Sequence, residues 1–128
     1  MNIIIANIKW IMLVSGVITC SMFLSTISPS AGLLNTFGET LADTPIMHIV
    51  VRNWGALIGL IGGMLIYGAF NPINRSFILA VAAISKMIFI SLVLVYGSQY
   101  LAKAGIAVVF DSIVVLLYIA YLVSVRKS

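Results

Sequence analysis

The chain has few of the residues on which soluble domains, metal sites and catalytic sites depend. Of its 128 residues only 8% are charged, with three acidic residues, one histidine and one cysteine. A soluble domain usually carries about a quarter charged residues, so the composition excludes an ordinary soluble fold. A single thiol also excludes a disulfide within the chain, and we expect Cys20 to pack as a small hydrophobe.

The motifs of nucleophilic and metal chemistry are missing as well. There is no H-x-x-x-H, C-x-x-C or G-x-S-x-G arrangement, and His48 and Cys20 are separated by a whole connecting segment. One histidine also cannot supply bis-histidine haem ligation. We therefore expect no catalytic residues, no metal and no haem, and a chain that is not an enzyme on its own.

Hydrophobic residues dominate instead, at 62% of the chain, with a mean hydropathy of +1.22. A bilayer crossing takes about 20 apolar residues. Four runs meet this length: 4–27, 46–70, 76–97 and 104–125. The sequence predicts an all-α integral membrane four-helix bundle with antiparallel, up-and-down helices, forming a single domain over residues 1–128.

The first run is expected to remain as a helix rather than to be removed as a secretory signal. Its amino end is apolar rather than basic, and no A-x-A site follows it.

The connections between the runs differ in kind. "NPINR" and "SQYLAK" are short turns that make their flanking helices antiparallel neighbours. The first connection, "SPSAGLLNTFGETLADTP", is longer and has apolar residues at helical spacing: Leu33, Leu34, Phe37 and Leu41. This pattern predicts a short amphipathic helix at the membrane interface, with a mobile polar loop as the alternative.

The distribution of charge predicts an orientation. The net charge of +4 comes from cations that lie mostly at helix ends, which argues against a nucleic-acid partner. One side of the predicted bundle carries Lys9, Arg75, Arg126 and Lys127, and the other carries Lys103 with Glu39 and Asp43. The positive-inside rule places both termini in the cytoplasm, with the bacterial inner membrane as the expected location.

Three charged residues lie within the predicted spans. Arg52 is expected about 9 Å inside the outer end of the second span, and Asp111 about 10 Å inside the outer end of the fourth. A charge at the bilayer centre costs about 2.5–3.5 kcal/mol and usually pairs, so we predict an ion pair between Arg52 and Asp111. Lys86 lies deeper, and its stem extends towards the same carboxylate.

Small residues accompany these charges. One face of the second span is predicted to press against a neighbouring helix, because glycines allow close approach. That face comprises His48, Arg52, Gly55, Gly59 and Gly63, with Gly62 close by. Gly16, with Ser15, Thr19 and Cys20, offers a second such surface on the first span.

Several functions are compatible with the polar cluster His48, Arg52, Asn53, Lys86 and Asp111. As a structural bridge it would belong to a non-enzymatic accessory or interaction subunit, with the bilayer, other membrane subunits or further copies of the chain as partners. As a pocket it would bind an anionic or carbonyl-bearing ligand, such as a quinone, a lipid headgroup or a small acid. A proton- or ion-coupled oligomeric transporter is the third hypothesis.

Two segments carry a family resemblance: "VVRNWGALIGLIGGMLIYGAF" and "VVFDSIVVLLYIAYL". With an Arg before a glycine-rich helix and an Asp opening an aromatic-ended one, the chain resembles small four-helix bacterial membrane proteins of a DoxX-like kind. This resemblance implies an accessory role near quinones, without cofactor-binding or catalytic residues that transfer to this chain.

The predicted orientation is testable with tags. Cysteine or epitope tags at Asn35 and Ser98 are expected to react with impermeant reagents added from outside the cell, because both positions belong to the outer connections. Protection of both tags would reverse the topology.

Overall fold

The computed structural model describes residues 2–127 and confirms the all-α bundle, with no strand among these residues. In chain order the elements are α1 (Asn2–Cys20), η1 (Ser21–Phe23), α2 (Leu24–Ile27), α3 (Pro29–Phe37), α4 (Pro45–Ala69), η2 (Pro72–Asn74), α5 (Arg75–Tyr96), η3 (Ser98–Tyr100) and α6 (Leu101–Lys127). Four helical stretches are long and apolar enough to cross a membrane.

These candidate spans are Ile3–Ile27, Pro45–Ala69, Pro72–Tyr96 and Ser98–Arg126. The last two begin earlier than predicted, because the short 3-10 turns η2 and η3 lead directly into α5 and α6. At the first of these turns, Arg75 donates to the carbonyl oxygens of Gly68 at 3.1 Å and Ala69 at 2.9 Å. A guanidinium that satisfies the last carbonyls of α4 explains how so short a turn closes.

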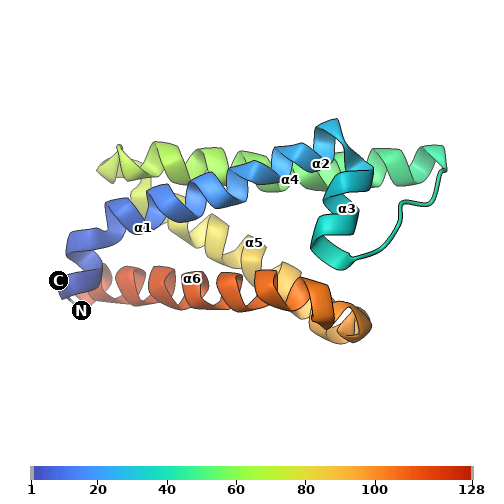
Figure 1. The fold of residues 1–128 in the computed structure, drawn as a ribbon. Coiled ribbons are helices and arrows are strands. Elements are labelled where there is room, and N and C mark those ends of the chain that lie inside the picture. Colours follow the sequence, from blue (N-terminus) through green and yellow to red (C-terminus); the bar gives the residue numbers. More distant parts are fainter. Residues whose placement is uncertain (1, 128) are drawn as a thin grey trace.

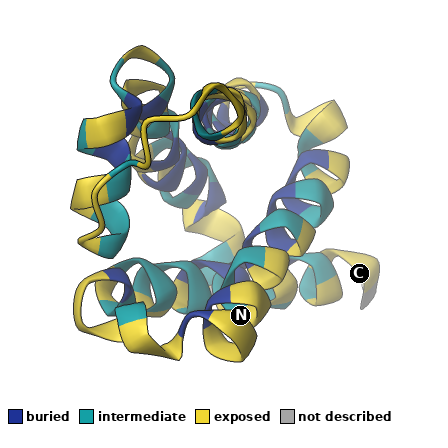
Figure 2. Ribbon diagram, turned by 90° about the vertical axis from the view of Figure 1, so that its right-hand side faces the viewer, coloured by how far each residue is buried: buried dark blue, intermediate teal, exposed yellow. Residues whose placement is uncertain are grey.

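The long helices run antiparallel, with α1 packed chiefly against α4 and α5 against α6 (Figure 1). Both termini and the α4–α5 turn lie at one end of the bundle, called here the terminus end. At the other, the α3 end, the short helix α3 lies across the bundle (Figure 1). Buried residues face the neighbouring helices and exposed residues face outward, as expected for helices surrounded by lipid (Figure 2).

The first span contains a 3-10 turn, η1, against which α4 packs closely. A Cβ added at Gly55 would lie 2.6 Å from Ser25 Cβ and 2.8 Å from the backbone oxygen of Met22. One added at Gly59 would lie 2.5 Å from the Phe23 ring. Larger side chains at these positions would push the two helices apart.

Gly62 meets the backbone of Cys20 in the same way, but Gly63 does not share this contact. It is exposed, and an added Cβ there would meet nothing within 4 Å. The close contact therefore covers a narrower face of α4 than the predicted one.

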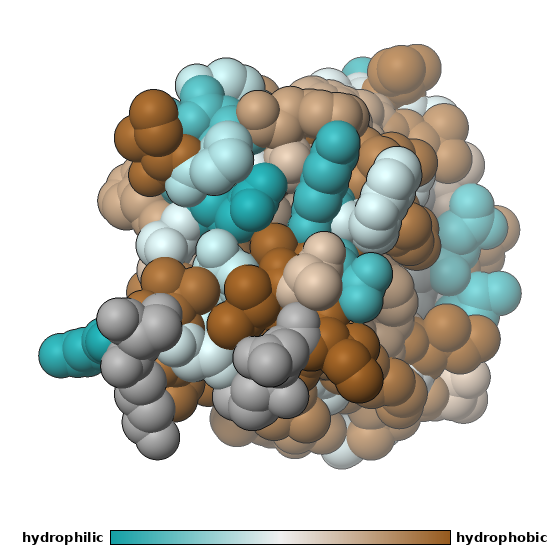
Figure 3. Space-filling view, turned by 90° about the vertical axis from the view of Figure 1, so that its left-hand side faces the viewer, coloured by the Kyte–Doolittle hydropathy of each residue, from teal (hydrophilic) through white to brown (hydrophobic). Residues whose placement is uncertain are grey.

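The terminus half of the bundle is filled by apolar side chains. The largest fully buried ones there are Ile8, Met12, Leu65, Leu79 and Tyr118. The hydroxyl groups of Ser15 and Tyr118 are hydrogen-bonded at 2.5 Å, which ties α1 to α6. Hydrophilic side chains appear among hydrophobic ones on the outer surface of this end (Figure 3).

The predicted amphipathic helix corresponds to α3, although Leu41 lies beyond its end. Pro29 occupies its first position, and Gly38 ends it with a left-handed φ of 74° while donating to the Leu34 carbonyl. Both features are typical helix boundaries.

We expect Gly55→Ala to lower the free energy of unfolding in detergent micelles by about 1–3 kcal/mol, because the added methyl group meets α2 and backbone. Gly63→Ala is the matched control on the same helix, and its stability should be unchanged or slightly higher. Equal stabilities for the two variants would contradict the close contact. Equilibrium unfolding followed by circular dichroism measures both.

Candidate functional site

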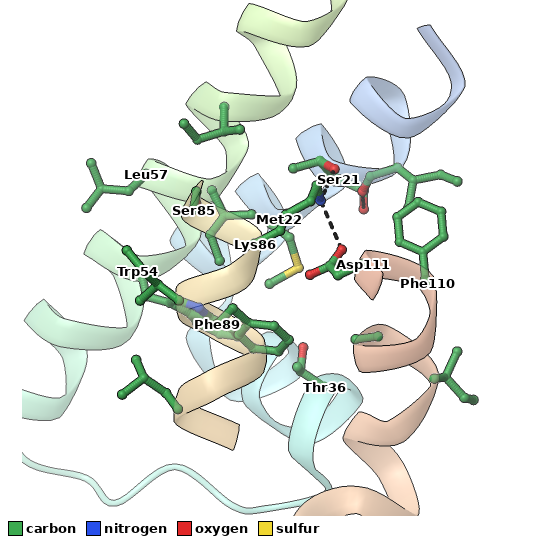
Figure 4. A pocket seen from close by; sticks show the side chains of 18 of the residues that line it. Ser21, Met22, Thr36, Trp54, Leu57, Ser85, Lys86, Phe89, Phe110 and Asp111 are labelled. Carbon is green, nitrogen blue, oxygen red and sulfur yellow. Dashed lines mark hydrogen bonds and ion pairs between the residues drawn. The ribbon is translucent and has the colours of Figure 1, made fainter. Parts of the chain in front are cut away.

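An ion pair within the bundle joins α5 to α6. Lys86 Nζ donates to Asp111 Oδ1 at 2.9 Å and to Thr19 Oγ1 at 3.1 Å, so that α1 takes part as well (Figure 4). The side chains of Lys86 and Asp111 are only 7% and 14% exposed. Charges in such surroundings persist only when they are paired and hydrogen-bonded, as both are here.

The predicted pairing of Arg52 with Asp111 is wrong. Arg52 is exposed, and its Nη1 donates to the backbone oxygen of Thr26 at 2.6 Å. The Thr26 hydroxyl donates in return to the backbone oxygen of Arg52 at 3.0 Å. Asp111 is paired with Lys86 instead.

The reason is that the two side chains lie at different positions along the bundle axis. Thr19 marks the level of the buried ion pair and Thr26 marks the level of Arg52; on one helical stretch they lie two turns, or about 10 Å, apart. The prediction counted residues from the end of each span as if all spans began at one plane. However, α4 begins well beyond the ends of α5 and α6 that lie nearest α3 (Figure 1).

The other two members of the predicted cluster also lie elsewhere. His48 Nε2 is 3.2 Å from Asp43 Oδ1, with the His48 side chain 37% exposed. Asn53 is exposed on α4. Of the five predicted residues, the structure brings together only Lys86 and Asp111.

The ion pair forms part of the wall of a cavity of about 700 Å³ in the α3 half of the bundle. All four spans and α3 contribute to this wall, which is mainly apolar (Figure 4). Its polar and charged members are Thr19, Ser21, Asn35, Thr36, Ser85, Lys86, Lys103 and Asp111. Trp54, Phe89 and Phe110 supply aromatic surface.

Asp111 retains hydrogen-bonding capacity towards this cavity. Its Oδ2 accepts no hydrogen bond from the residues that the structure describes, and no fully buried side-chain oxygen or nitrogen among them lacks a partner. Oδ2 is therefore accessible, and Asp111 lines the cavity. Lys86 Nζ has one N–H beyond its hydrogen bonds to Thr19 and Asp111 and lies 5.6 Å from the centre of the Phe110 ring.

An aromatic cluster lies where α3 meets the longer helices. The Phe37 ring centre is 5.8 Å from that of Trp54, 6.3 Å from Phe89 and 5.7 Å from Tyr100. Phe37 and Tyr100 also line a smaller cavity of about 340 Å³ nearer the 38–44 connection. The end of α3 thus lies between the two cavities.

Sequence reasoning missed most of this wall. It assigned Thr19 to helix packing and gave Trp54 no role, and it placed Phe37, which lines the smaller cavity, on the apolar face of an interfacial helix. The signals that pointed inward were the charges of Lys86 and Asp111 and the place of Thr19 on a small-residue face; residues far apart in sequence create the rest of the cavity.

No protein-family model, curated protein or solved structure matches this chain. The geometry of the chain therefore carries the functional argument.

Asp111→Asn is expected to lower the free energy of unfolding by about 3–5 kcal/mol, because it leaves the Lys86 ammonium buried without its counter-charge. The double variant Lys86→Met/Asp111→Leu should recover most of this loss, since apolar side chains need no partner. Equilibrium unfolding in micelles measures the effect. Asp43→Asn, which changes an exposed carboxylate, is the control, and an Asp111→Asn variant as stable as that control would contradict the role of the ion pair.

Proposed function

We propose that this chain is a non-enzymatic integral membrane protein that binds a membrane-soluble molecule with a carbonyl or hydroxyl head group in the inter-helix cavity. The observation that carries the proposal is the Lys86–Asp111 pair in the wall of a cavity of about 700 Å³. Small-molecule sites are typically apolar spaces of about 300–1,000 Å³ with a few placed polar groups.

The polar groups indicate what the head group would need. The free N–H of Lys86 can donate to a carbonyl oxygen, and Oδ2 of Asp111 can accept from a hydroxyl group. Lys86 and Asp111 neutralise each other, so a neutral head group with both capacities suits this part of the wall. The aromatic surface of Trp54, Phe89 and Phe110 favours a flat head, as in quinone-like molecules.

The rest of the ligand would be apolar and would extend into the bilayer. Leu57, Ile88 and Leu92 line the cavity and are also more than half exposed on the outer surface of α4 and α5. Such residues at the cavity edge offer a lateral route for a hydrocarbon tail. A lipid-like or quinone-like molecule meets both requirements.

Binding is favoured over transport because the cavity is confined to the α3 half. Packed side chains such as Met12, Leu65 and Tyr118 fill the terminus half among the described residues. An accessory role in a larger membrane assembly accords with this binding function and with the DoxX-like resemblance. The excess of cations at the terminus end supports an inner-membrane location with that end in the cytoplasm.

The proposal is tested by filling the cavity without disturbing the ion pair. Ala107 lines the cavity on α6, whereas Ala102 on the same helix is exposed and does not. Ala107→Phe should weaken binding of a decyl-tailed benzoquinone and of monooleoylglycerol by about tenfold or more, and Ala102→Phe should leave it unchanged. Ligand-dependent shifts of Tm in micelles measure the affinities.

A linear alkane of matching length, which has no head group, should bind more weakly than either probe. Equal affinity of wild type and Ala107→Phe for both probes would place binding outside the cavity. Equal binding of the alkane would remove the role assigned to Lys86 and Asp111.

A further inference from the structure

Arg52 presents a charge at the surface of a candidate span. It lies within Pro45–Ala69, and its side chain makes one hydrogen bond among the described residues, the 2.6 Å bond to Thr26. A guanidinium carries several more N–H donors, and these are left facing outward. In a membrane, donors and charge at such a position need a partner.

The described part of the chain offers no counter-charge. None of the three side-chain carboxylates, those of Glu39, Asp43 and Asp111, lies within 4.0 Å of the Arg52 guanidinium. Arg52 does not line either cavity, so the ligand proposed above does not supply the charge either. The partner for the charge and the remaining N–H donors of Arg52 must therefore come from outside the chain.

The position of Arg52 along the bundle identifies those surroundings. The two hydrogen bonds between Arg52 and Thr26 hold it at the end of α2, just before α3 begins at Pro29. α3 lies across the bundle at this end (Figure 1), an arrangement typical of a helix at the membrane interface. Phospholipid phosphates occupy that level.

We propose that Arg52 is a binding site for the phosphate of a phospholipid in the leaflet on the α3 side. A guanidinium can donate two parallel hydrogen bonds to phosphate oxygens, which gives both affinity and orientation. The bond to Thr26 holds the guanidinium in place before the lipid arrives. Asn53, exposed beside Arg52 in the sequence, offers a further donor to the head group.

The test uses the full chain, delipidated in detergent and titrated with dioleoylphosphatidylglycerol under native mass spectrometry. Arg52→Gln should weaken binding about tenfold or more, and Arg52→Lys should weaken it several-fold because an ammonium cannot form the parallel pair. Arg126→Gln is the matched control, an exposed arginine at the terminus end, and should bind as wild type does.

Two further probes separate the sources of affinity. Dioleoylglycerol has the same chains without phosphate, so its binding should not depend on Arg52; an equal loss in Arg52→Gln would overturn the proposal. Inorganic phosphate should not displace the lipid at equal concentration, and its doing so would replace the lipid site with a general anion site. Should Arg52→Gln fail to fold, unchanged affinity of Arg52→Lys would overturn the proposal.

Discussion

The ion pair between Lys86 and Asp111 couples the rotations of three helices. It joins α5 to α6 at 2.9 Å, and the bond from the same ammonium to Thr19 extends the contact to α1. Turning α5 or α6 would leave a charge unpaired in an apolar interior, where its desolvation is costly, and turning α1 would remove the Thr19 hydroxyl from the ammonium. The pair therefore fixes the rotation of α5 and α6 about their axes, and with it which of their side chains face the hydrocarbon. Apolar packing alone would allow several rotations of similar energy.

The cavity lies between two separately packed pairs of helices, α1 with α4 and α5 with α6. Gly55 and Gly59 let α4 approach the first span closely, so the backbone of α4 is drawn towards η1 and α2 in the α3 half. The α5–α6 pair is held together separately, and α3 with Phe37 bridges the remaining space. In the terminus half, large side chains such as Met12 and Tyr118 fill the corresponding volume. The bundle is therefore tightly packed in its terminus half and holds the cavity in its α3 half.

The positive charges of Lys86 and Arg52, which lie at different levels of the bundle, are compensated in different ways. Lys86 is buried and finds its partner inside the chain, whereas Arg52 is exposed and has one backbone partner. The membrane explains the difference, because hydrocarbon cannot stabilise a charge while the phosphate layer can. Lys86 therefore forms part of the cavity wall, and Arg52 is the residue proposed to contact a phospholipid phosphate.

Local sequence properties determined the spans, their antiparallel order and the helix α3, because hydrophobic length, proline, glycine and apolar spacing act within a few residues. They also identified Lys86 and Asp111 as charges needing partners. Tertiary structure alone decided that these two pair with each other and that Arg52 does not join them, since the offset of α4 along the bundle axis comes from its packing on α1 and α2. The cavity likewise depends on residues from four spans and α3, and the sequence of no single segment determines how far apart these helices lie.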